Sequence, residues 1–114
     1  MRDNRNQKRR NSPHRVNVLG AADNRVVGRL VNITIGGLMY LVAEPPSKGT
    51  RLELSIPLPT MANGKMTIEV TGTVAWSAPD ANPEFQRVGV EFENLGAEEG
   101  YIIETVLQRL HLVG

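Results

Sequence analysis

The sequence predicts an all-β domain that ends in one helix, and three observations support this fold class. Six short segments are rich in β-branched residues or alternate apolar with polar residues, as strands with one wet face do. Glycine, proline, asparagine and aspartate separate these segments at short, fairly even intervals. Past Gly96 the apolar residues recur at helical spacing. Six strands at this spacing are typical of an antiparallel barrel or sandwich.

The first three expected strands surround a pair of glycines. They cover residues 16–18, 26–33 and 38–42, and the glycines Gly36 and Gly37 precede the third of them. Glycine adopts positive φ angles readily and leaves the backbone uncovered. We therefore expect a sharp turn at this pair, where a flat or anionic group could approach the backbone closely.

The last three expected strands cover residues 51–58, 66–76 and 87–93. The first of these alternates cleanly, and Pro57 indicates that its end lies at a sheet edge, because proline cannot donate a ladder hydrogen bond. An Asn-Gly pair within residues 61–64 predicts the turn that follows.

One amphipathic helix is expected from about residue 97 to residue 111. Its apolar residues share one face, and acidic or polar residues occupy the other. The acidic first turn suits the helix dipole, as do Arg109 and His111 in the last turn. Most simply, the apolar stripe closes one end of the β-structure; the alternative is that an uncovered part of it pairs with a second copy or another partner. The apolar positions are Ile102, Ile103, Val106, Leu107 and Leu110.

The length and composition fit a single domain. A chain of 114 residues with 40% hydrophobic and 22% charged residues can bury one modest core. No apolar run is long enough to cross a bilayer, and the polar N-terminus does not resemble a secretory signal. Cysteine is absent, which excludes disulfides and thiol chemistry and fits a reducing compartment. We therefore expect a cytoplasmic protein without membrane association.

Charge is segregated along the chain, and this divides it into a basic N-terminal arm, residues 1–15, and a barrel domain, residues 16–114. Residues 1–16 hold six basic residues and one acidic residue, a net charge of +5, whereas the rest holds seven basic and eleven acidic residues, a net charge of −4. A basic arm on an acidic body favours an anionic partner: a nucleotide, a nucleic acid, a membrane or an acidic protein surface. The alternative is a solvated tail without a ligand.

Residues that could perform catalysis or hold a metal are scarce. His14 and His111 are far apart in sequence, and neither has a metal-ligand spacing with another histidine or a carboxylate. Glu91 and Glu93 share one strand face, which is common on any polar face. The sequence has neither a Gly-X-Ser-X-Gly elbow nor a phosphate-binding loop that ends in Lys-Ser or Lys-Thr. We therefore expect neither an enzyme nor a metal site.

Binding of a guanine nucleotide is better supported. The planar fork of arginine can bond two acceptors of a phosphate or of guanine, and its flat face can stack on a base. Arg9, Arg10 and Arg15 lie within seven residues on the arm. Asn32 could bond the polar edge of a base, and Thr34 could reach a phosphate or a backbone group. The alternative is that Asn32 and Thr34 simply bond the local backbone.

The combination of these motifs resembles the PilZ domain family, receptors for the bacterial second messenger cyclic di-GMP. That family has an Arg-X-X-X-Arg element before a six-stranded β-barrel, an Asp/Asn-X-Ser-X-X-Gly motif on the barrel and a C-terminal helix. Residues 32–37 resemble the second motif, with Asn first, Thr in place of Ser and Gly37 as the closing glycine. Residues 28–31, 72–76 and 88–95 are also similar, so the resemblance covers nearly the whole chain.

The arginine element departs from the family spacing. Four residues separate Arg10 from Arg15, one more than usual, whereas Arg5 and Arg9 have the usual gap but lie further from the barrel. A bend at Pro13 could absorb the extra residue. The departure leaves two arginine pairs as candidates.

The resemblance implies a cyclic di-GMP site made of the arm and the barrel motif. The arm would bind guanine and phosphates, and the barrel motif would hold the opposite guanine. We expect Trp76 in the core, in phase with Val74, with a place beside a base as the alternative. The site residues that this implies are Arg5, Arg9, Arg10, Arg15, Asn32, Thr34, Gly36, Gly37 and Trp76.

The function that the resemblance implies is a switch. Cyclic di-GMP would fix the arm against the barrel and so create a surface for an unidentified downstream protein in motility, biofilm or polysaccharide control. The working unit would be a monomer or a weak dimer. One alternative is a ligand-independent interaction module with the same fold. Another is a nucleic-acid-binding barrel, but the acidic body lacks an extended positive face and the strands lack an aromatic stacking platform.

Overall fold

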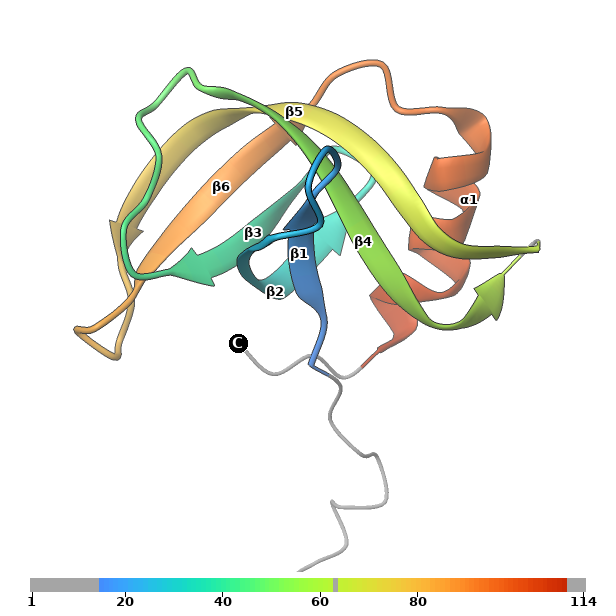
Figure 1. Ribbon diagram of the computed structural model, residues 1–114, viewed down its shortest axis with the longest axis horizontal. Helices are drawn as coiled ribbons and strands as arrows, with labels where there is room; N and C mark the ends of the chain where they lie inside the picture. Colours follow the sequence, from blue (N-terminus) through green and yellow to red (C-terminus); the bar gives the residue numbers. More distant parts are fainter. Residues whose placement is uncertain (1–14, 63, 111–114) are drawn as a thin grey trace, which may run out of the picture.

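A computed structural model describes residues 15–62 and 64–110, which form a closed barrel of six antiparallel strands with a helix against it (Figure 1). Around the barrel the strands follow the order β1-β2-β3-β6-β5-β4. This confirms the predicted six-stranded antiparallel barrel and selects it over a sandwich. The strands are β1 (Asn17–Gly20), β2 (Val26–Thr34), β3 (Gly37–Val42), β4 (Arg51–Ala62), β5 (Lys65–Pro79) and β6 (Gln86–Phe92).

The barrel interior is filled by alternate residues of all six strands, together with apolar residues of the C-terminal segment. Tyr40 is the largest of the fully buried side chains. A Cβ atom at Gly28 would collide with its ring, so glycine at that position lets β2 pass over the tyrosine. The Tyr40 hydroxyl has no hydrogen-bond partner among the described residues. Burial raises the pKa of Tyr40 to about 12 because an ionised phenol would lose its hydration.

A bulge in β2 changes which of its side chains face outward. Leu30 pairs with Tyr40, and the next pair is Asn32 with Met39, so Val31 is an extra residue in β2. Such a bulge reverses the alternation beyond it. Asn32 is therefore exposed on the outer face.

A second bulge lies in β5 and corrects the expectation for Trp76. Val74 pairs with Val90, and the next pair is Trp76 with Gly89, so Ala75 is an extra residue. Val74 remains in the core, but Trp76 turns to the outside and is 43% exposed. The predicted core position of Trp76 is wrong because the regular two-residue period ends at this bulge.

The β4–β5 hairpin is longer than expected. Ala62 pairs with Lys65, so the turn contains only residues 63 and 64, of which Asn63 lies outside the described residues. Gly64 has a φ of +77°, a conformation that glycine adopts without strain. The pairs between β1 and β4 end at Ser55, and Pro57 pairs only with β5. Pro57 thus occupies a part of β4 with one partner strand, where a missing donor costs little.

The C-terminal helix is shorter than predicted. Helix α1 (Ala97–Thr105) has Val106 as its C-cap, and a short 3-10 helix, η2 (Leu107–Arg109), follows. Arg109 therefore does not lie in the last turn of α1, which has no basic residue, and His111 lies outside the described residues. The expected apolar face is confirmed: Ile102, Ile103 and Leu107 are buried in the barrel core, and Val106 and Leu110 pack against it.

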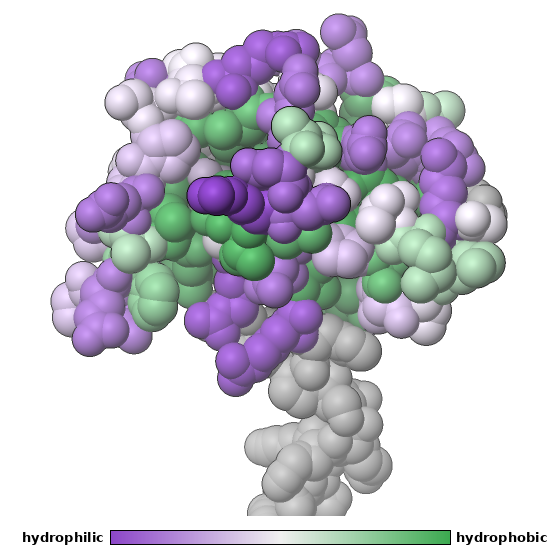
Figure 2. Space-filling view, viewed as in Figure 1, coloured by the Kyte–Doolittle hydropathy of each residue, from purple (hydrophilic) through white to green (hydrophobic). Residues whose placement is uncertain are grey.

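The outer surface mixes hydrophilic residues with apolar ones. Figure 2 shows hydrophilic residues over much of one face, with apolar residues between them and toward the edge near the β4–β5 hairpin. Within the part of the chain that the structure describes, no helix has the length and hydropathy needed to span a bilayer.

Candidate functional site

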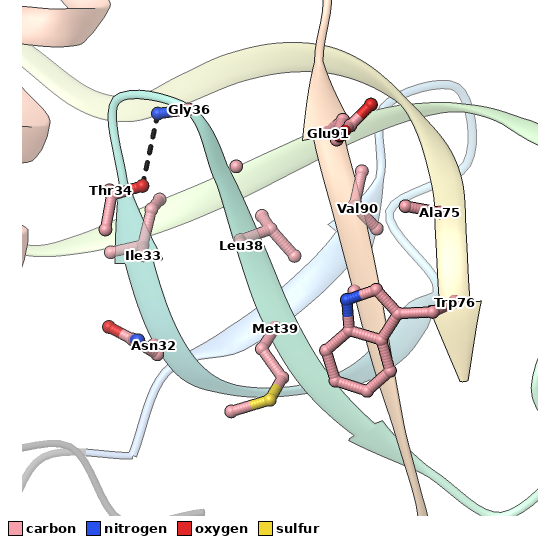
Figure 3. Close-up of a pocket in the computed structure, with 12 residues that line it drawn as sticks. Asn32, Ile33, Thr34, Gly36, Leu38, Met39, Ala75, Trp76, Val90 and Glu91 are labelled. Carbon is pink, nitrogen blue, oxygen red and sulfur yellow. Dashed lines mark hydrogen bonds between the residues drawn. The ribbon is translucent and has the colours of Figure 1, made fainter. Parts of the chain in front are cut away.

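Four outward-facing residues form one row across four neighbouring strands. Asn32 of β2 pairs with Met39 of β3, Met39 pairs with Gly89 of β6, and Gly89 pairs with Trp76 of β5. Both bulges contribute to this alignment, because the bulge in β2 turns Asn32 outward and the bulge in β5 turns Trp76 outward. Figure 3 shows Asn32, Met39 and Trp76 side by side on this face.

A second row lies one step nearer the β2–β3 turn. Thr34 pairs with Gly37, Gly37 pairs with Glu91, and Glu91 pairs with Thr73. Together the two rows border a shallow, open depression of about 300 Å³. The predicted site residues of the barrel all line it: Asn32, Thr34, Gly36, Gly37 and Trp76.

The Trp76 indole rests on the backbone of Gly89. A Cβ atom at Gly89 would collide with Nε1 and Cε2 of the indole. Glycine at this position therefore lets the ring approach the sheet while much of the ring remains exposed. An exposed indole held in this way offers a flat apolar surface beside the polar groups of β2.

The Thr34 hydroxyl already serves the β2–β3 turn. The backbone N–H of Gly36 donates a hydrogen bond of 3.1 Å to Thr34 Oγ1 (Figure 3). This is the local bond that a threonine before a turn commonly makes. The hydroxyl hydrogen remains free of this bond, so Thr34 can stabilise the turn and still donate to a ligand.

The two glycines of the motif have different structural roles. Neither is among the residues with positive φ, so the turn does not use the left-handed conformation that glycine allows. At Gly37 a Cβ atom would collide with the carbonyl oxygen of Val90, because β3 and β6 approach closely there. At Gly36 a Cβ atom would meet only Thr34 Oγ1, at 3.7 Å. Gly37 is thus required by packing, whereas Gly36 lies at an open position of the turn.

The depression has little positive charge of its own. Among its described lining residues Glu91 is the only charged one. Arg15 is exposed and lines a separate hollow beside Pro57 and Pro59 of β4, so the structure does not bring it to the depression. The other predicted arginines, Arg5, Arg9 and Arg10, lie outside the described residues.

The arm joins the barrel next to the motif strand. The carbonyl oxygen of Val16 accepts a hydrogen bond of 2.8 Å from the backbone N–H of Leu30. Leu30 precedes Asn32 by two residues on β2, so the chain enters the barrel close to one end of the first row. Among the described residues no group of three or more potential ligand side chains could hold a metal ion.

Seven of the twelve lining residues were not predicted from the sequence as part of a site, and three of these belong to the two rows. Met39, Gly89 and Glu91 line the depression beside the predicted residues. Of these, Gly89 was the easiest to predict. It stands between two inward-facing valines in an alternating strand, so it faces outward, and its uncovered backbone leaves room for a large side chain from a neighbouring strand. The bulge that turns Trp76 to that face could not be predicted from the sequence.

Comparisons with known proteins agree with the fold. A family model described as the PilZ domain matches residues 3–110. Among solved structures, the Bacillus subtilis inhibitor of motility (MotI/DgrA) has a similar fold, with a TM-score of 0.61 and 20% sequence identity over 87% of this chain and 47% of that chain. This chain therefore spans about half the length of that protein. No curated protein sequence matches this chain.

Proposed function

Because this chain belongs to the PilZ domain family, we propose that it is a receptor for cyclic di-GMP, which binds between the outer depression and the N-terminal arm. The observation that carries this proposal is the convergence of the motif, residues 32–37, and an exposed indole, Trp76, on one depression. A guanine base needs both kinds of contact, because it has a polar edge and a flat face.

The two ends of the first row would contact different parts of the ligand. Three interstrand spacings separate Asn32 from Trp76, which corresponds to about 14 Å along the sheet. The Asn32 amide, with donors and an acceptor, would bond the edge of one guanine, and the Thr34 hydroxyl would donate to a phosphate or a base. The Trp76 indole would pack against a flat or apolar part of the ligand.

The arm would provide the positive charge that the depression lacks. Cyclic di-GMP carries two phosphates, and Glu91 alone would repel them. Arg9, Arg10 and Arg15 are the first candidates, with Arg5 as part of the alternative pair. Arg15 would have to move away from the hollow beside Pro57 to take this role. Attachment of the arm beside β2 supports this arrangement, because the arm can then fold over the depression without crossing the barrel.

We further propose that the ligand acts as a switch. Fixing the arm against the barrel would change the surface that a downstream protein meets. The ordering entropy of the arm is subtracted from the binding energy, so the affinity should be moderate and should fall with salt. The output proposed is motility, biofilm or polysaccharide control, and the name of the structural neighbour, an inhibitor of motility, supports motility among these. The protein would act in the cytoplasm, without catalysis or a metal, as a monomer or a weak dimer.

Calorimetric titration with cyclic di-GMP tests the site. Arg9→Ala/Arg10→Ala should abolish binding without altering the thermal unfolding of the barrel. Arg25→Ala is the matched control, because Arg25 is an exposed arginine in the β1–β2 turn, and it should leave binding unchanged. Unchanged binding in the double variant would show that the assigned arginines are wrong.

The alternative functions give different outcomes in the same titration. A ligand-independent interaction module would bind no cyclic di-GMP at any salt concentration. This alternative is supported by the irregular spacing of the arginines in the arm. A nucleic-acid-binding barrel would prefer single-stranded RNA and would lose affinity steeply between two salt concentrations.

A further inference from the structure

Exposed apolar side chains gather where the β4–β5 hairpin meets α1. Met61, Met66 and Tyr101 are 63%, 55% and 57% exposed. Lys65 Nζ of the hairpin lies 3.4 Å from Glu98 Oε1 in the first turn of α1, which joins the two elements. Large side chains are seldom left in water at such exposure in a group, and a group of them indicates a contact surface.

The contact between Lys65 and Glu98 places the end of the hairpin, with its two methionines, beside the first turns of α1. The pair Ala62–Lys65 closes the hairpin, and Met61 and Met66 are the residues next to this pair on β4 and β5, where the register of the two strands shifts. Tyr101 follows Glu98 by three residues and therefore lies on the same face of α1. We call Met61, Met66 and Tyr101 the hairpin–helix patch. Figure 2 shows apolar residues beside hydrophilic ones at this edge of the molecule.

An acidic groove begins at the same turn of α1. It has a volume of about 560 Å³, and Glu69, Glu93 and Glu99 line it together with a single cation, Arg51. The Arg51 guanidinium is already engaged, at 3.0 Å from Glu53 Oε2 and 3.3 Å from Glu93 Oε2. Three carboxylates against one guanidinium leave the lining with a net negative charge. A cationic side chain of a partner would be attracted to this groove.

We propose that the hairpin–helix patch and the acidic groove together bind a protein segment that carries large apolar side chains next to a lysine or arginine. The methionines provide a flexible apolar surface that adapts to such side chains. The carboxylates select the positive charge and repel anionic lipid headgroups and nucleic acid. The basic arm of this chain does not fit, because it has no large apolar residue after Met1.

This inference extends the proposed function, since it gives the chemistry of the downstream partner, but it does not depend on the nucleotide site. None of the lining residues of the depression belongs to the patch or the groove. The two surfaces can therefore be altered separately, and cyclic di-GMP binding serves as an independent readout for every variant of this surface.

Selection of binders from a library of random peptides displayed on phage tests the proposal with the full chain. The selected peptides should combine lysine or arginine with large apolar residues. Met61→Ser/Met66→Ser should weaken their binding about tenfold. Glu69→Gln/Glu99→Gln should weaken it about fivefold at low salt, with a smaller loss at high salt. Val26→Ser is the matched control, because Val26 is 62% exposed at the start of β2, and it should leave binding unchanged.

Several results would overturn the proposal: no selected peptide, a consensus without basic residues, peptides that bind the variants unchanged, or capture of anionic lipid vesicles through Met61 and Met66. Calorimetry with cyclic di-GMP on the same proteins separates the two proposals. Peptide binding that is lost while nucleotide binding persists concerns this surface alone. A wild-type chain that binds the peptides but not the nucleotide refutes the proposed function and leaves this inference standing.

Discussion

Replacing each glycine of the β2–β3 turn by alanine gives the sharpest test of the site geometry. In Gly37→Ala the new Cβ atom would collide with the Val90 carbonyl oxygen, and that oxygen belongs to the backbone of β6. The clash can be relieved only if β3 and β6 move apart. In Gly36→Ala the new atom meets only the Thr34 hydroxyl at van der Waals distance, and the backbone conformation suits alanine.

The two substitutions should therefore differ in sign as well as in size. Forcing one extra carbon into a packed site costs about 1–3 kcal/mol, and we expect Gly37→Ala to lie near the upper end because backbone must shift. In a domain of this size that corresponds to a fall in Tm of roughly 4 °C per kcal/mol. Gly36→Ala should change the free energy of unfolding little, or raise it by about 0.5 kcal/mol through the unfolded state. Urea unfolding and thermal unfolding followed by circular dichroism measure both effects.

Nucleotide binding gives the second readout for this pair. Since Gly37 lies at the centre of the second row, separation of β3 from β6 should also weaken cyclic di-GMP binding below the unfolding temperature. Equal free energies of unfolding for the two variants would refute the reasoning, because they would mean that Gly37 does not stand against Val90. A destabilised Gly36→Ala would show that the turn needs the left-handed conformation after all.

Three further predictions follow from individual contacts. Trp76→Ala should weaken cyclic di-GMP binding by about 1–3 kcal/mol, the usual cost of losing a stacked aromatic, and unchanged affinity in calorimetry would remove Trp76 from the site. Thr34→Ser should keep the affinity whereas Thr34→Val should lower it about fivefold, and equal affinities would mean that the hydroxyl serves only the turn. Tyr40→Phe should raise the free energy of unfolding by about 1 kcal/mol, because it removes a buried hydroxyl without a partner. The folded Tyr40 phenol keeps its proton up to about pH 12, whereas the unfolded phenol loses it near pH 10. The free energy of unfolding of the wild type should therefore fall by about 1.4 kcal/mol per pH unit in that interval. This slope should be smaller in Tyr40→Phe.

The site illustrates how two single-residue bulges assemble a surface. Asn32 and Trp76 lie on β2 and β5, which are not neighbours in the barrel, and two strands separate them. Each follows an extra residue, Val31 or Ala75, that resets the alternation of its strand. Bulges commonly re-aim side chains beside functional sites. The expectation that Trp76 follows Val74 into the core failed for this reason alone.

The C-terminal segment shows a similar limit. Its apolar spacing correctly predicted which side chains enter the core, but it did not predict where the α-helical winding stops. After Thr105 the chain continues as η2, whose Leu107 is buried and whose Gln108 Nε2 donates to the carbonyl oxygen of Ile33 at 3.3 Å. These contacts with β2 favour the tighter winding of the 3-10 helix. No residue type within the segment predicts them.

Features that arise from near neighbours along the chain could be predicted from the residues alone. These are the six strands, the amphipathic helix, the Asn-Gly turn and the motif at the β2–β3 turn, because alternation, turn chemistry and helical spacing act over a few residues. Three features depend instead on how the strands pair: Trp76 faces outward, Gly37 stands against Val90, and Asn32 and Trp76 border one depression. Register and bulges arise from pairing between strands far apart in sequence, so each strand's own pattern cannot contain them.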